Sequence, residues 1–451
     1  MKTASTPILM VLGWIGLFVA GQAEAKSPVL PVQVAPAGNM PVQNGPAQGN
    51  TPAEDRVFTE GIAAPAEGGM LMDNGLWDGA SVTPGCTICG GGYSAPPDWY
   101  VEEGARILTR SRPRGINLGF QPGIDIFGRQ VSDPVIATRS ARPDISAAWS
   151  TTIGHYFARD IYDRDHFVEF SFWGLNGWRD QRQVNGQRTE VFAGTNVLVF
   201  GSLNSLDSSF DNYLNGFNRA DQQSIFYASY TNNFEINGRF APRGRTDRLV
   251  LHPDGRWRRE CQPGQYMSYL YGLRFMQINE TFNFHSQGTT DTYSPDPSSP
   301  SGYTLTDSHF YTGDYDAVAH NNLLGLQIGV EMIFRQCRWN WGIHSKLSPC
   351  VNFSDQASNI NSTDVTTGTT WFNRQIAASK HEASLIGEVG FEATFKFRPN
   401  LMGRAAYDFT WVTGLALAPE QLQMTTLPVN KINTNGTLFM HGISLGLEWL
   451  W

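Results

Sequence analysis

The sequence is poor in charged side chains, which make up 16% of its 451 residues. Lys and Glu in particular are sparse, although they are among the residues that usually cover solvent-exposed helices. The formal net charge is -8, and basic residues form no long block, so nucleic-acid binding has no electrostatic basis. These deficits argue against a mainly helical fold and against a nucleic-acid partner.

Long apolar runs are also missing. The uncharged stretch from Ile8 to Ala20 is shorter than the roughly 20 residues that a spanning helix needs. With Lys2 before it and the small-x-small sequence ending at Ala25 after it, this stretch predicts a secretion signal over residues 1–25. The mean hydropathy of -0.29 argues against a hydrophobic helical membrane protein.

Residue types and spacings that signal chemistry are scarce. Five cysteines, an odd number, do not make a disulfide framework for so long a chain, and nine scattered histidines show no metal-ligand spacing. Gly442-Ile-Ser444-Leu-Gly446 matches a hydrolase motif, but the chain ends five residues later, so we interpret it as the small-residue face of a strand. We therefore predict no catalytic residue, no metal site and no cofactor.

The composition changes along the chain. Residues 26–54 are rich in Pro, Gly, Gln, Ala and Asn, with almost no charge and no aromatic residue, so they cannot bury enough surface to fold. Residues 55–98 keep this composition and add isolated aromatic residues. We predict a signal peptide over 1–25, a flexible Pro/Gly-rich periplasmic segment over 26–98 and a β domain over 99–451.

The strongest pattern in the sequence is an alternation of period two from Glu382 to Arg398. Apolar or small residues occupy the odd positions from Ala383 to Phe397, and most of the residues between them are polar or charged. An average soluble strand has about 5 or 6 residues, whereas a tilted membrane-spanning strand needs about 9 to 11. The length of the alternation therefore predicts a strand that crosses a membrane.

The same pattern returns around residues 269–275, 324–334, 339–347, 403–411 and 443–451. Short connections at 335–337 and 399–400 alternate with long polar segments at 285–320, 351–379 and 414–436, as periplasmic turns alternate with outer loops. The segment 237–265 breaks this rule, and is either an inserted loop or a hidden hairpin. We predict a transmembrane antiparallel up-and-down β-barrel of about 12 strands, in a range of 10–14, with strands near residues 99, 115, 144, 165, 189, 221, 266, 321, 338, 380, 400 and 437.

The last strand is expected to pair with the first, because an open edge in lipid would leave unpaired backbone groups. The chain ends on Trp451, which resembles the terminal aromatic signal recognised by the barrel-insertion machinery. The expected partners are therefore outer-membrane lipid and that machinery, with small solutes as a further possibility.

The charged face of the strands should point into the lumen if the apolar face meets lipid. Charges of both signs could line a water-filled pore. In a narrow barrel they could instead pair with one another and fill the interior as a plug. The candidate lumen-facing residues are Glu331, Glu382, Glu388, Glu392, Lys396, Arg398, Arg404 and Asp408.

Several blocks of the sequence resemble one known family. Met267 to Phe275, Asn322 to Gly329, His381 to Glu388 and Leu401 to Phe409 are similar to blocks of the putative beta barrel porin-7 family of planctomycete outer-membrane proteins, and Phe170 to Leu175 is similar to an earlier block. The resemblance covers roughly residues 99–451. It implies an outer-membrane barrel with a porin role, and it carries over no catalytic or ligand residue.

Three functions are compatible with these patterns. The leading hypothesis is passive diffusion of small hydrophilic solutes through the lumen, since one face of the strands is charged. The alternative is a non-conducting surface-binding or structural barrel with a closed interior. A barrel lipase is a third hypothesis, because a serine–histidine pair on a barrel wall is spatial and leaves no local motif.

Overall fold

The computed structural model describes residues 98–451, except 125–129, 143, 163, 187–188, 194–195, 201–203, 206–215, 243–247, 252, 254–256, 261–263, 300–301, 337, 399 and 424–429. The predicted signal peptide and the predicted Pro/Gly-rich segment, apart from Asp98, lie outside the described residues.

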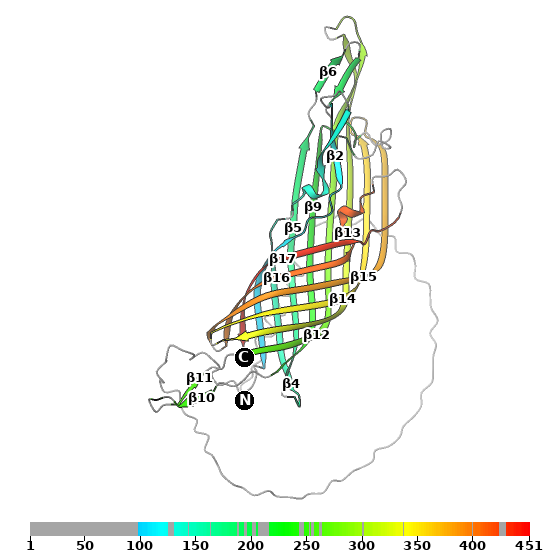
Figure 1. Cartoon of the computed structure of the whole chain (residues 1–451). Coiled ribbons are helices and arrows are strands. Elements are labelled where there is room, and N and C mark those ends of the chain that lie inside the picture. The colour runs from blue at the N-terminus through cyan, green and yellow to red at the C-terminus, as the bar shows by residue number, and fades with distance from the viewer. Residues whose placement is uncertain are drawn as a thin grey trace, which may run out of the picture. The chain divides into compact units, whose positions relative to one another are not determined.

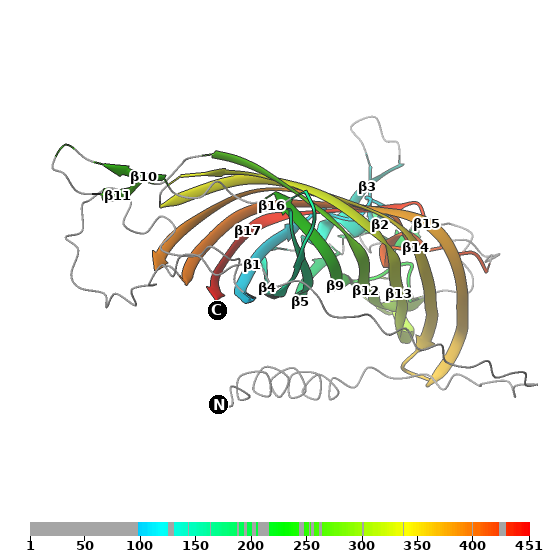
Figure 2. The ribbon, with the colours of Figure 1, turned by 90° about the horizontal axis from the view of Figure 1, so that it is seen from below.

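The β domain is a closed antiparallel barrel (Figure 1). Around the ring the strand order is β1-β17-β16-β15-β14-β13-β12-β9-β5-β4, and β4 pairs back with β1. The last strand pairs with the first from Tyr100–Leu450 to Arg110–Met440, as predicted, and the two lie side by side in Figure 2. The ten strands are β1 (Trp99–Arg110), β4 (Ser146–Arg159), β5 (Arg164–Asn185), β9 (Gln222–Pro242), β12 (Gly264–Pro295), β13 (Tyr303–Arg335), β14 (Trp339–Asp364), β15 (Thr369–Arg398), β16 (Leu401–Leu415) and β17 (Gly436–Leu450).

Ten of the twelve predicted segments form the ring. The other two, near residues 115 and 189, are strands as predicted, but they pair in small sheets outside it, because alternation indicates an extended chain and not its partner. The segment 237–265 contains a hairpin that also stays outside the ring, so the count is at the lower end of the predicted range. The outlying strands are β2 (Asn117–Ile124), β3 (Gln130–Ala137) and β8 (Asn204–Ser205), β6 (Thr189–Ala193) with β7 (Asn196–Phe200), and β10 (Arg248–Leu251) with β11 (Trp257–Glu260).

Among the described residues, two short 3-10 helices lie between strands, η1 (Thr138–Ser140) and η3 (Ala418–Gln421). In the described part of the chain, no helix combines the length and the apolar character that crossing a membrane would require.

The predicted short turns are confirmed, but two of the three predicted long loops are wrong. β13 ends at Arg335 and β14 begins at Trp339, and β15 is joined to β16 just as briefly. In contrast, the polar segments 285–320 and 351–379 are continuations of strands, which pair as far as Pro295–Tyr303 and Asp364–Thr369. Their outward-facing residues are polar because the strands extend beyond the hydrocarbon region, and this composition suggested loops.

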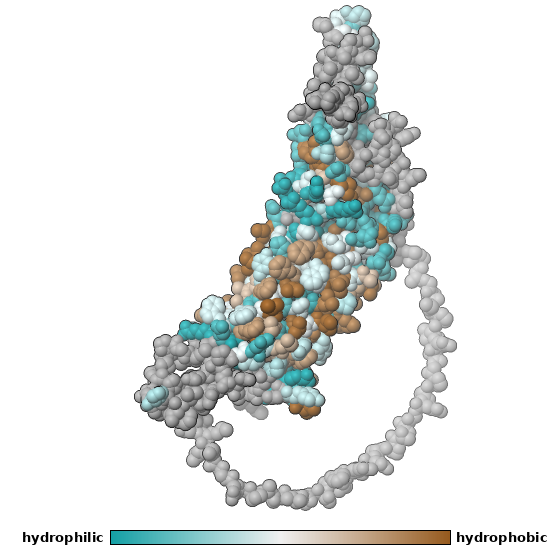
Figure 3. All heavy atoms as spheres, in the orientation of Figure 1, coloured by the Kyte–Doolittle hydropathy of each residue, from teal (hydrophilic) through white to brown (hydrophobic). Residues whose placement is uncertain are grey.

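The two faces of β12 exchange their polarity along its length. Near its start, outward-facing Tyr271, Leu273 and Phe275 are exposed. After Phe275 the outward positions are Gln, Asn and Thr, whereas inward-facing Ile278 and Phe282 are fully buried. An apolar exterior indicates contact with lipid, and an apolar interior under a polar exterior is typical of a sheet in water. The apolar side chains gather over the lower half of the barrel in Figure 3, below a more hydrophilic region.

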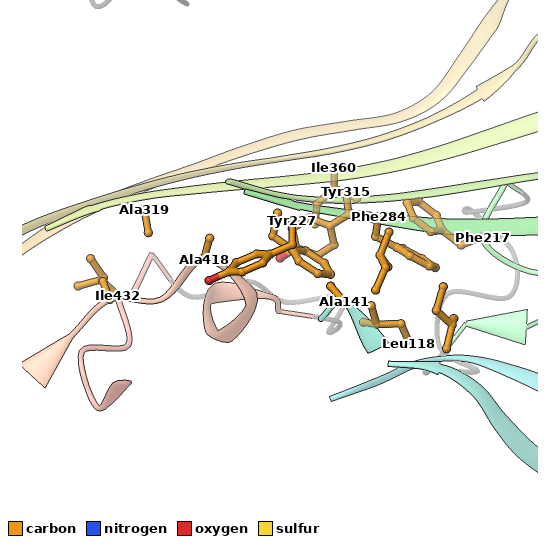
Figure 4. Packing of buried hydrophobic residues seen from close by; sticks show 14 residues of the cluster. Leu118, Ala141, Phe217, Tyr227, Phe284, Tyr315, Ala319, Ile360, Ala418 and Ile432 are labelled. Atoms are coloured by element: carbon orange, nitrogen blue, oxygen red, sulfur yellow. The ribbon is translucent and has the colours of Figure 1, made fainter. Parts of the chain in front are cut away.

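The part of the barrel beyond this boundary has its own hydrophobic core (Figure 4). We call it the outer core. The segment 414–436 connects β16 to β17 as the predicted loop, and its first part folds inward, since Ala416, Leu417 and Ala418 are all buried. The fully buried amide of Asn321 holds this segment by bonding both N–H and C=O of Ala416. The outer core comprises Leu118, Ile136, Ala141, Phe217, Ile225, Tyr227, Phe282, Phe284, Tyr315, Ala319, Ile360, Ala416, Ala418 and Ile432.

The outer hairpin of β12 and β13 should weaken as pH rises. Hydrogen bonds to Asp307 and Asp364 raise the pKa of His309, and a hydrogen bond to Asp314 raises the pKa of His285. A raised histidine pKa contributes stability that is complete below the ordinary value of about 6.5 and is lost as pH rises through the higher folded value. We expect the protection of backbone amides in this hairpin from hydrogen exchange, corrected for the intrinsic exchange rate, to fall as pH rises through the folded pKa values of the two histidines. In the double variant H285Q/H309Q this decline should disappear, and an unchanged decline would contradict the assignment.

Candidate functional site in the barrel lumen

A charged cavity of about 310 Å³ occupies the lumen near the short turns, and residues from all ten barrel strands line it. Its lining has more carboxylates than cationic side chains, by seven to four, before His344 is counted. The cavity is therefore an electronegative compartment bounded by the inward face that alternation predicted. The carboxylates are Glu102, Glu169, Glu235, Glu331, Glu388, Glu392 and Glu448, and the cations are Arg106, Arg239, Lys346 and Arg404.

Two arginines join neighbouring parts of the wall at the more accessible end of the cavity. Arg239 of β9 pairs with Glu169 of β5 and Glu331 of β13. Arg404 of β16 pairs with Glu102 and Glu392, at 2.5 Å from each. Both guanidinium side chains keep 27–28% of their surface exposed, so water reaches this layer.

Deeper in the lumen the charged side chains are less exposed to water than in this arginine layer. Arg274 is fully buried and donates to Glu388 at 3.0 Å and to Asn233 at 2.7 Å. Lys346 lies 3.1 Å from Glu235. These contacts join β12 to β15 and β14 to β9, so they span the interior and do not follow the wall. Desolvated charges persist only when they are paired in this way.

The deepest ion pair connects nearly opposite sides of the ring. Arg110 of β1 and Glu280 of β12 lie 2.8 Å apart, and their side chains are 1% and 0% exposed. Four strand steps separate β1 from β12 by the shorter path, or about 19 Å along the wall at the usual strand spacing. Glu280 also accepts hydrogen bonds from Tyr227 at 2.7 Å and from the N–H of Ala418 at 3.0 Å. The pair and its partners therefore cross the interior at this level.

Apolar side chains fill the lumen around this level, and we call them the inner apolar layer. They come from eight of the ten barrel strands and from the segment before η3, and all are buried. Between the charged cavity and the outer core, the side chains of these described residues therefore pack the lumen. The layer comprises Leu108, Trp173, Trp178, Met276, Ile278, Leu323, Cys350, Ile386, Val412, Leu415, Leu417, Leu438 and Met440.

Five of the eight predicted lumen residues come together. Glu331, Glu392 and Arg404 belong to the accessible arginine layer, and Glu388 and Asp408 lie deeper. The other three do not join them. Glu382 pairs with Lys380 and bonds Thr434 toward the outer side, and Lys396 and Arg398 lie near the turn that precedes β16.

The sequence prediction missed the inward-facing residues of β9, including Glu235 and Arg239. Its segment from Ser224 to Ile236 has mixed faces, because it crosses the polarity boundary: inward Ile225 and Tyr227 are apolar, whereas Asn233 and the residues after it are polar. A search for alternation in which the apolar and polar faces exchange partway along the strand would have revealed them. In β5 the register shifts between Trp173 and Asn176, which hides the pattern further.

The hydrolase-like motif near the C-terminus lies within β17, as the strand interpretation predicted. Ser444 donates a hydrogen bond to Asp408 at 3.0 Å. A Cβ on Gly442 would lie 1.9 Å from the carbonyl oxygen of Ile107, so the glycine permits close approach of β1. The small residues of the motif thus serve strand packing.

Comparison with known proteins adds one family and several structures. The family model described as Putative beta barrel porin-7 matches residues 143–451. No curated protein matches the chain. The outer membrane protease OmpT from Escherichia coli is similar over 79% of this chain and 97% of its own, with 11% identity and a TM-score of 0.33.

Two further structures show weaker similarity. A deletion mutant of TodX, titled a monoaromatic hydrocarbon channel, is 8% identical and covers 79% of this chain and 90% of its own, with a TM-score of 0.24. A FadL homologue from Pseudomonas aeruginosa is 9% identical, covering 78% and 89%, with a TM-score of 0.21. The barrel fold of this chain is shown by its own strand pairing.

Proposed function

The chain belongs to the Putative beta barrel porin-7 family, and we propose that it is an outer-membrane barrel that does not conduct solutes freely and presents a rigid sheet on the outer side of the membrane. The observation that carries this proposal is the Arg110–Glu280 pair, which crosses the ring while fully buried. Moving such a pair apart would leave two uncompensated charges in an apolar layer. The interior therefore resists opening.

The extended strands support the presenting role. β12 and β13 have 32 and 33 residues, about three times what a membrane crossing needs. Their outer parts enclose the outer core and expose polar residues, which is the arrangement of a stable sheet in water. Lipid would contact the apolar band, and the terminal Trp451 would serve recognition by the barrel-insertion machinery. The proposal assigns the chain no enzymatic role.

Planar-bilayer recording tests the closed interior. The purified wild-type protein, inserted in a bilayer at defined salt concentration, is expected to give no discrete conductance steps. Detergent without protein serves as the blank, and insertion is verified by protection of the barrel from added protease. Regular steps from the inserted wild-type protein would contradict the proposal.

The second candidate is passive diffusion of small hydrophilic solutes, and the charged cavity favours it. Its excess of carboxylates predicts that any pore would prefer cations. For conduction the Arg110–Glu280 pair would have to rearrange. If steps are seen, the variant E392Q should lower their cation selectivity, whereas E382Q, outside the cavity lining, should leave it unchanged. That combination would establish the channel in place of the closed barrel.

A further inference from the structure

A histidine and two carboxylates converge deep in the lumen. His344 of β14 pairs in register with Gly390 of β15, and Gly390 pairs with Asp408 of β16, so these residues form one row across three strands. Glu388 lies two residues from Gly390 on the same inward face. The three polar side chains therefore approach one another above a glycine.

The spacing of the three groups suits a shared ligand. His344 Nε2 lies 3.4 Å from Asp408 Oδ1 and 3.7 Å from Glu388 Oε1. One possible ligand atom from each residue lies within 4.8 Å of the other two. Around a tetrahedral ion with bonds of about 2.1 Å, ligand atoms are separated by about 3.4 Å. The observed separations match this geometry and are long for direct hydrogen bonds.

An unpartnered carboxylate oxygen faces the gap between these groups. Asp408 Oδ1, which faces His344 Nε2, has no hydrogen-bond partner among the described residues, although Asp408 is only 3% and His344 8% exposed. A Cβ at Gly390 would lie 2.4 Å from Asp408 Oδ1 and 2.5 Å from His344 Nε2. Glycine at this position thus allows both side chains to lie over the strand. A buried acceptor without a donor is costly, so a cation between Asp408 Oδ1 and His344 Nε2 would satisfy it.

The neighbouring hydrogen-bond donors and cations contact mainly the carboxylate oxygens that do not face His344 Nε2. Arg274 donates to Glu388 Oε2, and Ser444 donates to Asp408 Oδ2, from which Arg106 lies 3.7 Å away. Lys346 Nζ lies 3.9 Å from Glu388 Oε1, beyond hydrogen-bond distance. Glu392 faces His344 Nδ1 at 3.9 Å. The oxygens that face His344 Nε2 therefore stay available, and the carboxylate excess of the cavity favours uptake of a positive ion.

We propose that His344, Glu388 and Asp408 bind a divalent transition-metal ion of the Zn²⁺ type. The imidazole nitrogen favours such an ion over Mg²⁺ or Ca²⁺, which prefer oxygen ligands. His344 and Glu388 also line the cavity, so a water molecule there can supply a fourth ligand. This site goes beyond the proposed function and does not depend on whether the barrel conducts.

Metal titration of the full chain in detergent tests the site. After chelator treatment, Zn²⁺ is titrated calorimetrically and bound metal is measured by elemental analysis, with one Zn²⁺ per chain expected. H344Q and D408N should each weaken binding by at least about 100-fold, since even indirect partners of a metal site contribute 10–100-fold. G390A should weaken it while keeping all three ligands. H309Q, which alters a histidine between two aspartates in the outer hairpin, is the matched control and should bind like the wild type.

Cobalt spectroscopy gives a readout that does not depend on losing a ligand. H344C replaces the imidazole by a thiolate, so its Co²⁺ complex should gain a thiolate charge-transfer band that the wild type and H309C lack. Three results would overturn the proposal: no stoichiometric Zn²⁺ in the wild type, undiminished binding in folded H344Q, or no new band in H344C. Displacement of Zn²⁺ by an equal concentration of Ca²⁺ would overturn the transition-metal assignment. If His344, Glu388 and Asp408 are instead held together only by ion pairs with a protonated imidazole, the wild type will bind no stoichiometric Zn²⁺.

Discussion

Glu280→Ala is expected to lower the free energy of unfolding of the barrel by about 3–5 kcal/mol, because removing one partner of a buried ion pair leaves the other charge uncompensated. Arg110 would remain in the inner apolar layer without its carboxylate. Tyr227 and the N–H of Ala418 would also lose their acceptor. Urea-induced unfolding in detergent micelles, followed by tryptophan fluorescence, measures the change.

The matched control is Glu382→Ala, which removes the carboxylate of an exposed pair. Lys380 and Glu382 keep 47% and 37% of their side-chain surface exposed, so this change should cost far less stability than E280A. The double variant R110A/E280A should lose less than the sum of the two single variants, since neither charge then stays unpaired. Equal losses in E280A and E382A would show that the lumen pair is solvated and the interior open.

Leu326→Arg is expected to destabilise the inserted barrel by about 1–3 kcal/mol, the cost of a cationic side chain that faces hydrocarbon between its outer edge and its middle. Leu326 lies on the outward face of β13 with 66% of its surface exposed, between the exposed side chains of Leu324 and Ile328. Unfolding of the protein in lipid vesicles, followed by its shift in electrophoretic mobility, measures the change.

His320→Arg on the same face of the same strand is the control. It lies six residues closer to the outer hairpin, where its partners on the neighbouring strands, Asn279 and Asp355, are polar. This change should alter the free energy of unfolding by less than about 0.5 kcal/mol, as an ordinary surface substitution does. If H320R proved as costly as L326R, the membrane boundary drawn at the polarity exchange would be in the wrong place.

The membrane strands were predictable where one face stays apolar over a whole crossing. The alternation around Leu324 to Phe334 is an example, because every second residue meets lipid and the pattern needs no knowledge of the partner strand. The same reasoning failed for the outer parts of β12 and β13, which were predicted as loops. There the polar residues face water, and the apolar residues that reveal a strand face inward.

The lumen site was only partly predictable. Glu388, Glu392 and Asp408 were predicted to face the lumen because they lie on the charged face of alternating strands. Glu280 was not, since it lies on the inward face beyond the polarity exchange, among apolar neighbours such as Ile278 and Phe282. Its partner Arg110 is 170 residues away in the sequence, and no local pattern connects them.

The sequence by itself determined that this chain forms membrane-spanning strands and, from residue 269 onward, which face of those strands is charged. These properties are local, since a period of two residues assigns each side chain to lipid or lumen. Only the tertiary structure decided that ten strands form the ring, that a buried ion pair crosses the lumen, and that His344 meets Asp408. Those properties depend on ring size and register, which bring side chains from distant strands within a few ångströms of one another.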